Sequence, residues 1–439
     1  PNAYTIVAEI LHEISVHGSA EIEQLIKDGG LALAIRFIGT QQNEKRMYHS
    51  LSCVLNILID SSRYTAYIVP AGVVDMLVSI FENDQYSTEL FRLCARVMSQ
   101  LVKQMSEDIH TEDVRVKLVF MSSNLIYSTD SVISSCAIQT LALVSFTNSM
   151  KVAMSIHVNF RTIFEQVNKF LEVKLMETQL DSFNRQYAMR FVAVWMARSD
   201  MEDDRQWMMQ KGLVKTVLAV ANANDVKTVE QALMCLQNIT AEGRDSMEQM
   251  MQEDVFYNVH TIKNKDMMKI KAEIAVLLCM GFANGTELHK ARIVCSCLAI
   301  PSMIASLVFP AIDIQRYCLQ GLLAAMTWGK EYVNRHGQGE PDTSIVNLIK
   351  KSFNIDTNDY IPYNPVKVII EKVAEIKTYD LKSILEQMQA YSKSEEIKNI
   401  AQSLDDVVFK EEDDTISTPH DSFVFCPPAN TSEDDGMKE

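Results

Sequence analysis

Residue types that could carry out catalysis are scattered along this sequence rather than grouped. No glycine-rich phosphate loop follows a strand-like segment, and neither a His-Glu-x-x-His nor a Gly-x-Ser-x-Gly motif occurs. Cys295 and Cys297 have the wrong spacing for a structural zinc site, and no paired Cys/His set accompanies them. The nine histidines are dispersed. The sequence therefore predicts a protein that is not an enzyme and that holds no metal or cofactor.

The composition indicates a folded and mainly helical protein. Of the 439 residues, 47% are hydrophobic and 22% are charged, which is typical of globular domains. The chain has only 14 glycines and 10 prolines but 24 methionines, and this balance favours helices over turn-rich β architectures. A net charge of −16 argues against nucleic-acid binding.

Cysteine usage and hydropathy indicate the compartment. The nine cysteines are odd in number and lie mostly in apolar helical stretches, as expected of free thiols in a reducing compartment. No basic segment of the secretory type begins the chain, so we expect a cytoplasmic protein, with the nucleus as a second compartment. The stretch from Ile293 to Ile312 carries no charge and has the length that spans a bilayer. Because serines and two prolines, Pro301 and Pro310, interrupt it, we expect buried core helices and no membrane insertion.

A nine-residue pattern recurs down the chain, and its clearest copies are Ser50–Leu58 and Ala232–Thr240. Every copy starts with a small residue: Ala8, Ser50, Cys94, Ala137, Ala188, Ala232, Ala275 and Gly321. The intervals lie in the forties, except for a longer one after Ala137. Such a period is typical of helical solenoids built from two- or three-helix units. A small residue lets each long helix approach its neighbour closely, so the pattern predicts stacked helices.

Three copies are preceded by a glycine about twenty residues earlier, namely Gly29, Gly72 and Gly212. A glycine before an apolar run marks a turn between helices, because glycine readily adopts the left-handed conformation that ends a helix. Polar stretches at 40–44 and 222–225 are expected to form loops before a long third helix. Each repeat is therefore predicted to contain a glycine-led helix, a polar loop and a long third helix.

This arrangement resembles the armadillo family, in which a Gly-led apolar helix is followed by a polar loop and a long helix. The resemblance covers about residues 1–330 and is strongest at 28–60 and 211–242. HEAT-type repeats have a similar period, so the subtype stays open. The resemblance implies an all-α, right-handed superhelical solenoid of about eight armadillo-like repeats.

Three regions follow from the pattern: a repeat array at 1–342, capping helices at 343–404 and an acidic tail at 405–439. We expect the cap to contain helices at Val366–Ile376 and Leu381–Leu404, which cover the apolar end of the stack. Extra length near 171–182 is expected to form a longer helix or an inserted loop. The tail has eleven acidic residues and two lysines, which predicts disorder.

The resemblance also implies a binding surface. In the armadillo family the long third helices line a concave groove, where an Asn on each helix can hydrogen-bond the backbone of an extended peptide. Asn56 and Asn238 stand at the matching positions, and Gln100 is a substitute. Importin-alpha has a fuller Asn ladder with a Trp four residues earlier, whereas Ser52 and Met234 occupy those places here, which disfavours classical nuclear-signal recognition. The alternative role for the two Asn residues is to cap local backbone.

Charged and polar residues occupy the positions four residues before this ladder in the middle repeats, namely Arg96, Gln139 and Arg190. Two arginines on one surface can clamp carboxylates or a phosphate of a partner. Pairing with neighbouring acids of the same chain is the alternative. The end repeats are apolar at the same place, for example at Ile10 and Leu277, so we expect a groove with a polar middle and apolar ends.

The tail contains a second candidate site. Phe423, Val424 and Phe425 form an apolar island between acidic residues, as in linear motifs that fold onto a partner. Thr418 and Ser432 are phosphorylation candidates, because a proline follows the first and acidic residues follow the second. A tail that only keeps the protein soluble is the alternative.

The leading hypothesis is a non-catalytic scaffold or adaptor that binds an extended or helical protein segment. Its groove residues would be Asn56, Ser52, Arg96, Gln100, Gln139, Arg190, Met234 and Asn238. The alternative is a client-binding chaperone or assembly factor similar to the myosin-chaperone armadillo domains, whose groove and methionine-rich surfaces grip non-native chains. Core filling is the default role of the methionines, and some exposure is expected for the pairs Met208–Met209 and Met250–Met251 at predicted helix ends. A nuclear transport adaptor is the third hypothesis. The partner, the pathway and the oligomeric state stay open.

Overall fold

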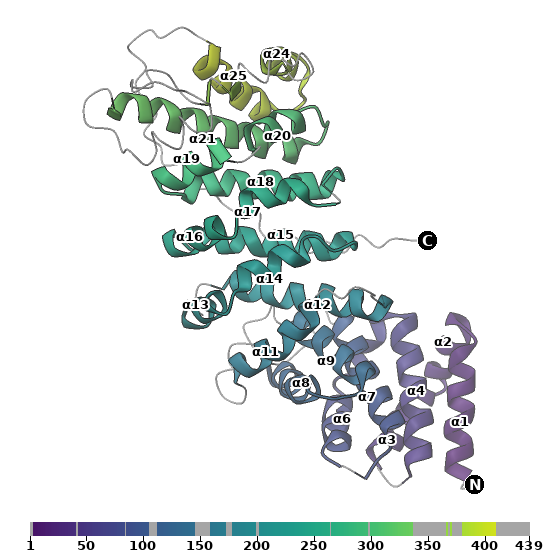
Figure 1. The fold of residues 1–439 in the computed structure, drawn as a ribbon. Helices are drawn as coiled ribbons and strands as arrows, with labels where there is room; N and C mark the ends of the chain where they lie inside the picture. Colours follow the sequence, from purple (N-terminus) through teal and green to yellow (C-terminus); the bar gives the residue numbers. More distant parts are fainter. Residues whose placement is uncertain are drawn as a thin grey trace. The chain divides into compact units, whose positions relative to one another are not determined.

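The structure is a computed structural model that describes residues 3–40, 43–83, 85–104, 112–144, 159–172, 178–198, 202–263, 265–296, 299–336, 366–367, 369–370 and 380–409. Throughout these ranges the regular elements are helices, as predicted (Figure 1). The chain divides into two compact units, Pro1–Lys211 and Gly212–Glu439, and each is described by itself.

Unit 1 is a stack of helices in which a long helix closes each repeat. Its elements are α1 (Ala3–Val16), α2 (Ser19–Lys27), α3 (Gly30–Gly39), α4 (Glu44–Asp60), η1 (Ser62–Tyr64), α5 (Thr65–Ile68), α6 (Val73–Phe81), α7 (Thr88–Lys103), α8 (Glu112–Leu125), α9 (Ser131–Val144), α11 (Phe160–Leu171), α12 (Gln179–Met196) and α13 (Glu202–Gln210). The long helices α1, α4, α7, α9 and α12 pack consecutively against one another, and α1, α4 and α7 can be followed side by side in Figure 1. We call these five the third helices of unit 1.

Unit 2 repeats the same plan. Its elements are α14 (Leu213–Val220), α15 (Val226–Ala241), α16 (Arg244–Gln252), α17 (Val255–Asn258), η3 (Val259–Thr261), α18 (Met268–Asn284), α19 (Glu287–Ser296), α20 (Ala299–Ser306), α21 (Ile312–His336), α24 (Leu381–Tyr391) and α25 (Glu395–Phe409). The third helices here are α15, α18 and α21, and α18 packs between the other two. The two units together contain eight described third helices, which is the number of repeats predicted.

The eight small residues of the sequence pattern all lie on third helices and inside the core. Their side chains are buried, or absent at Gly321. A Cβ atom added at Gly321 would lie 2.7 Å from the sulfur of Met303 on α20. Close approach between helices is thus the physical reason for the small residue that recurs in the sequence.

The predicted glycine turns are confirmed. Gly29, Gly72 and Gly212 have φ values of 83°, 80° and 81°, and each stands immediately before a short apolar helix. A fourth turn of the same kind precedes α17, where Asp254 takes the left-handed conformation with φ of 50°. Because a non-glycine residue fills that place, the sequence pattern did not reveal this turn.

The polar stretches before third helices act as N-terminal caps. The side chain of Asn43 accepts a hydrogen bond from the backbone N–H of Arg46 at 2.9 Å, and Asp225 accepts one from Thr228 at 2.8 Å. Such bonds satisfy backbone donors that the first helical turn leaves without partners. Each cap therefore fixes where a third helix starts, and with it the register of the side chains that helix exposes.

The C-terminal helices differ in detail from the expectation. The segment expected as one helix at Leu381–Leu404 forms two, α24 and α25, which break at Ser392–Ser394 and pack on each other. Helix α25 also packs on α21 and continues to Phe409, so the first residues assigned to the tail are helical. Residues 173–177 of the expected insertion, most of Val366–Ile376, and the tail from 410 onward lie outside the described residues.

Cysteine burial agrees with the sequence interpretation, since Cys53, Cys94, Cys136, Cys235, Cys279 and Cys318 are free and buried. Of the described helices, no single one is long and apolar enough to cross a membrane. Glu287–Val294 and Ala299–Ser306 together have the necessary length and composition, but they are bent by 67° where they meet.

Candidate functional site

Helix α7 contains two of the predicted site residues, Arg96 and Gln100, and further cationic side chains beside them. Its buried face holds Leu93, Val97 and Leu101, and its opposite face presents polar residues at helical spacing, listed in order as Arg92, Arg96, Gln100 and Lys103. Ser87 starts the helix by accepting a hydrogen bond from the N–H of Leu90. The cap and the apolar stripe together decide which side chains face outward.

The three cations of this face have different partners. Arg92 is paired with Asp130, because its Nε and one terminal nitrogen both lie 2.7 Å from the same carboxylate oxygen, Oδ2. This contact and two backbone N–H groups lower the pKa of the Asp130 carboxyl, with the arginine as the largest cause. Arg96 and Lys103 make no ion pair with a carboxylate in the part of the chain that the structure describes.

Helix α9 lies between α7 and α12 but exposes little of itself. Gln139, which was predicted to face the groove, is buried, and the prediction is wrong at this residue. Its side chain links three helices: the hydroxyl of Ser99 on α7 donates to its carbonyl oxygen, and its amide nitrogen donates to the hydroxyl of Tyr187 on α12 at 3.1 Å. A buried amide needs such partners, and here they come from both neighbouring third helices.

Side chains of α7 and α12 meet over this buried helix. The ammonium of Lys103 lies 5.7 Å from the centre of the Phe183 ring, and the rings of Phe183 and Tyr187 are edge to face at 4.7 Å. Burial lowers the pKa of Lys103. The side chain is thus partly removed from water, with an aromatic ring beside its charge.

The pKa of the Cys136 thiol on α9 is affected both by burial and by these cations. Burial raises its pKa to about 11, while the nearby charges of Arg96 and Lys103 act in the opposite direction. Because desolvation prevails, the thiol stays protonated at neutral pH and is not a nucleophile.

We define the α7–α12 surface as Arg96, Gln100, Lys103, Phe183, Tyr187 and Arg190. Arg96 and Lys103 are exposed, and the other four side chains are partly exposed. Three of these residues, Arg96, Gln100 and Arg190, were predicted from the sequence, and the structure places them on α7 and α12, the two third helices that pack on either side of α9. Cationic and aromatic side chains on one surface can hold a carboxylate beside an apolar group.

The sequence analysis did not identify three members of this surface, namely Lys103, Phe183 and Tyr187. Lys103 lies one turn after Gln100, and the spacing of Phe183, Tyr187 and Arg190 follows one face of α12. That spacing was the available signal. Lys103, Phe183 and Tyr187 lie at other repeat positions than the two that the armadillo resemblance assigns to the groove.

The predicted residues on α4 have a different role from those on α7. Ser52 is buried, so its prediction as a groove residue is wrong: the neighbouring helices cover it. Asn56 is half-buried, and its amide nitrogen donates to the hydroxyl of Ser15 on α1 at 3.0 Å. Side-chain amides have further donor and acceptor sites beyond this one bond. Asn56 thus contributes to packing between third helices and still reaches the surface.

In unit 2, Met234 and Asn238 lie one turn apart on α15 and are both half-buried. The equivalent residues of α18 are covered. Leu277 is fully buried, and a Cβ added to Gly281 would lie 2.6 Å from the Phe256 ring and 3.0 Å from Ile293. The expected apolar end of the binding surface is therefore core at α18, whereas Ile10 at the other end is half-exposed.

The remaining predictions concern the tail residues, the methionine pairs and metal binding. Phe423, Val424, Phe425, Thr418 and Ser432 lie outside the described residues. The methionine pairs at 208–209 and 250–251 are buried, so they are core residues and not client-facing surface. Over the described ranges, no group of three or more His, Cys, Asp or Glu side chains is placed to hold a metal ion.

Comparisons with known proteins identify the fold. No protein-family model matches the sequence, and no curated protein is similar to it. The crystal structure of an engineered protein from the Northeast Structural Genomics Consortium has a TM-score of 0.62 at 15% identity, over 92% of this chain and 95% of that chain. A shared fold is shown by this likeness, and the glycine-led, three-helix repeats identify it as an armadillo-like helical-repeat solenoid.

Two designed armadillo repeat proteins are also similar. One has a TM-score of 0.42 at 13% identity, over 53% of this chain and 91% of that chain. The other has a TM-score of 0.45 at 10% identity, over 57% of this chain and 98% of that chain, and was solved in complex with the peptide (KR)4.

Proposed function

We propose that the protein is a non-catalytic scaffold or adaptor that binds a segment of a partner protein along its third helices. The observation that carries this proposal is the α7–α12 surface, where side chains from the two third helices on either side of α9 present charge, amide and aromatic groups together. Stacked repeats commonly use such extended surfaces for binding. Asn56 on α4 is a further contact residue of unit 1 in this proposal, and Met234 and Asn238 on α15 are contact residues of unit 2, considered by itself.

A reducing compartment, the cytoplasm with the nucleus as a second location, is part of the proposal. Support for it comes from the six described cysteines, which are free and buried. The chaperone alternative depended partly on exposed methionine pairs, and Met208, Met209, Met250 and Met251 are buried. The scaffold is therefore the function we favour.

Site-specific photo-crosslinking in cells tests the proposal. A photoreactive residue replaces Gln100 on α7, and in the control it replaces Glu165, which is exposed on α11 outside the third helices. We expect Gln100 to capture one defined segment of one partner, identified by mass spectrometry, and Glu165 not to capture it. Capture of many unrelated unfolded chains at Gln100 would support the chaperone instead, and equal capture at both positions would contradict a third-helix site.

The acidic tail is tested in parallel. Capture at Gln100 is compared between the full chain and a chain that ends after Phe409. If the tail residues Phe423, Val424 and Phe425 dock the partner, truncation abolishes capture; if the third helices suffice, capture persists. Alanine at Thr418 and Ser432 shows in the same assay whether phosphorylation there matters.

A further inference from the structure

We infer that the α7–α12 surface binds an acidic protein segment, whose carboxylates contact Arg96 and Lys103 and whose apolar side chain packs on Phe183 and Tyr187. The inference rests on the proposed function, because it names the chemistry of the partner at the same third helices.

Arg96 and Lys103 carry charges that the described part of the chain leaves without an ion pair. Several other cations of unit 1 have acidic partners: Lys27 pairs with Glu23, Lys45 with Glu9, and Lys117 lies between Asp75 and Asp113. The exposed Arg36 and Lys169 resemble Arg96 and Lys103, since they make no ion pair with the described residues either. Arg92, one turn from Arg96, is paired with Asp130. Arg96 and Lys103 make no such pair with the described residues, although the chain carries a net charge of −16 and acids are abundant. These two cations are therefore available to carboxylates of another chain.

Lys103 has no carboxylate partner among the described residues, although its ammonium has lost part of its hydration. Burial lowers the pKa of its ammonium, which means that its charged form has lost solvation. A carboxylate at this place replaces the lost water with a charge-assisted hydrogen bond. Because the cation is already partly desolvated before binding, the partner gains the attraction while less desolvation remains to be done.

The spacing of the two cations favours a segment with separate carboxylates over a single phosphate. Arg96 and Lys103 are seven residues apart on one helix, so their backbone positions differ by about 10 Å along its axis. An extended chain advances about 3.3 Å per residue, so acidic residues three positions apart match this separation. One phosphate group cannot contact two cations whose attachment points are this far apart unless both side chains fold inward.

The aromatic pair supplies the apolar part of the surface. Phe183 and Tyr187 are half-buried and pack edge to face, and the Tyr187 hydroxyl is already engaged by Gln139. The ring surfaces, rather than the hydroxyl, thus remain for a partner. An apolar side chain of the partner, beside its carboxylates, is stabilised when it is buried against these rings. The expected segment therefore contains both acidic and apolar residues, unlike a simple polyanion.

Fluorescence anisotropy with the full chain and defined peptides tests the inference. The probe is a fluorescein-labelled peptide with the repeating sequence Glu-Leu-Ala, which places a Glu at every third position, and the control probe has Gln in place of each Glu. We expect the Glu peptide to bind about tenfold more tightly, a difference of about 1.4 kcal/mol. Binding should weaken as salt rises, since exposed charges are screened.

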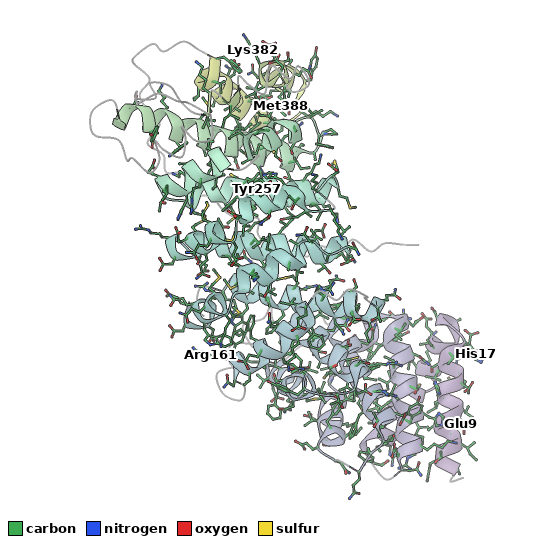
Figure 2. All side chains as sticks on the ribbon, in the orientation of Figure 1. Glu9, His17, Arg161, Tyr257, Lys382 and Met388 are labelled. Carbon is green, nitrogen blue, oxygen red and sulfur yellow. The ribbon has the colours of Figure 1, made fainter. Side chains whose placement is uncertain are left out.

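Matched variants locate the contact. Arg96→Gln and Lys103→Gln should each weaken binding of the Glu peptide several-fold, and the double variant should weaken it further. Arg161→Gln and Lys169→Gln remove the same two side-chain types from α11 and should leave it unchanged; Arg161, labelled in Figure 2, is exposed there and pairs with Asp204. Circular dichroism establishes that every variant is folded.

Three results overturn the inference: equal affinity for the Glu and Gln peptides, no effect of Arg96→Gln and Lys103→Gln, or tight binding only when phosphoserine replaces Glu. These failures are distinguishable from failure of the proposed function. If photo-crosslinking at Gln100 captures one defined partner segment that lacks acidic residues, the scaffold function stands and only the acidic specificity is rejected.

Discussion

The ammonium of Lys103 on α7 lies 5.7 Å from the centre of the Phe183 ring on α12, so two third helices that are not consecutive meet through their side chains. The helix between them, α9, is buried by this contact and by the link from Ser99 through Gln139 to Tyr187. A surface made in this way depends on three repeats at once. A substitution at the exposed Lys103 should therefore affect binding, whereas a substitution at the buried Gln139 should affect stability.

Replacing Lys103 with Met should leave stability intact while it removes binding. The substitution keeps an unbranched apolar stem and deletes a partly desolvated charge that has no described ion-pair partner, so we expect a change in the free energy of unfolding within about 0.5 kcal/mol. Arg92→Met is the matched control, because it breaks the pair with Asp130 and should lower the free energy of unfolding more than Lys103→Met does. Urea unfolding followed by circular dichroism measures both. A large loss in Lys103→Met would mean that the side chain is structural.

Replacing Gln139 with Leu should destabilise unit 1. The buried amide is hydrogen-bonded to both the Ser99 hydroxyl and the Tyr187 hydroxyl. Leucine removes both hydrogen bonds, so the free energy of unfolding should fall by about 1–3 kcal/mol. Adding Ser99→Ala to the variant should recover part of this loss, because one unsatisfied hydroxyl is then removed. Equilibrium unfolding of the single and double variants measures the effect, and a fully stable Gln139→Leu protein would contradict the role assigned to this link.

The repeat architecture was predictable because its cause is local. A small residue such as Ala232 appears wherever third helices touch, and a glycine such as Gly212 appears wherever the chain needs a left-handed residue, so both are visible in the sequence without knowledge of distant contacts. The turn at Asp254 shows the limit of this reasoning, since another residue type accepts the same backbone conformation there.

The composition of the surface was less predictable because burial on a third helix depends on its neighbours. Gln139 and Ser52 occupy the same repeat phase as Arg96, yet both are buried, and only the packing of adjacent helices decides this. Lys103 and Phe183 are eighty positions apart in the sequence, and their side chains meet over α9, the helix that lies between α7 and α12. The position of a residue in the repeat predicts which face of the helix it lies on, but whether its side chain is exposed can be judged only from the tertiary structure.

Adding a methyl group at Gly281 should be more costly than adding one at Gly321. The new Cβ at Gly281 would lie 2.6 Å from the Phe256 ring and 3.0 Å from Ile293, so two core side chains would have to move. At Gly321 the nearest atom is the flexible sulfur of Met303, at 2.7 Å. Alanine also favours helix over glycine by about 1 kcal/mol, so we expect Gly321→Ala to be near neutral and Gly281→Ala to cost about 1–3 kcal/mol. Thermal unfolding of the two variants checks the order, which the opposite ranking would contradict.

Unit 2 should lose stability as the pH falls from 6.5 towards 4, because of His260. Burial lowers the pKa of this imidazole from 6.5 to about 4, and its Nε2 has no hydrogen-bond partner among the described residues. Between these values the unfolded chain binds a proton that the folded chain does not, so acidification favours unfolding and the stabilising contribution is complete only above about pH 6.5. The shift corresponds to a loss of up to about 3 kcal/mol.

The variant His260→Gln removes this titration, since glutamine is neutral at every pH. The difference in the free energy of unfolding between the two proteins, measured with urea from pH 7 to pH 4, should change steadily in favour of the variant as acid is added. Taking the difference cancels the groups that both proteins share, such as His49, whose pKa is also lowered by burial. A difference that stays constant over this range would show that His260 titrates alike in the folded and unfolded chains, and thus that its imidazole is solvated in solution.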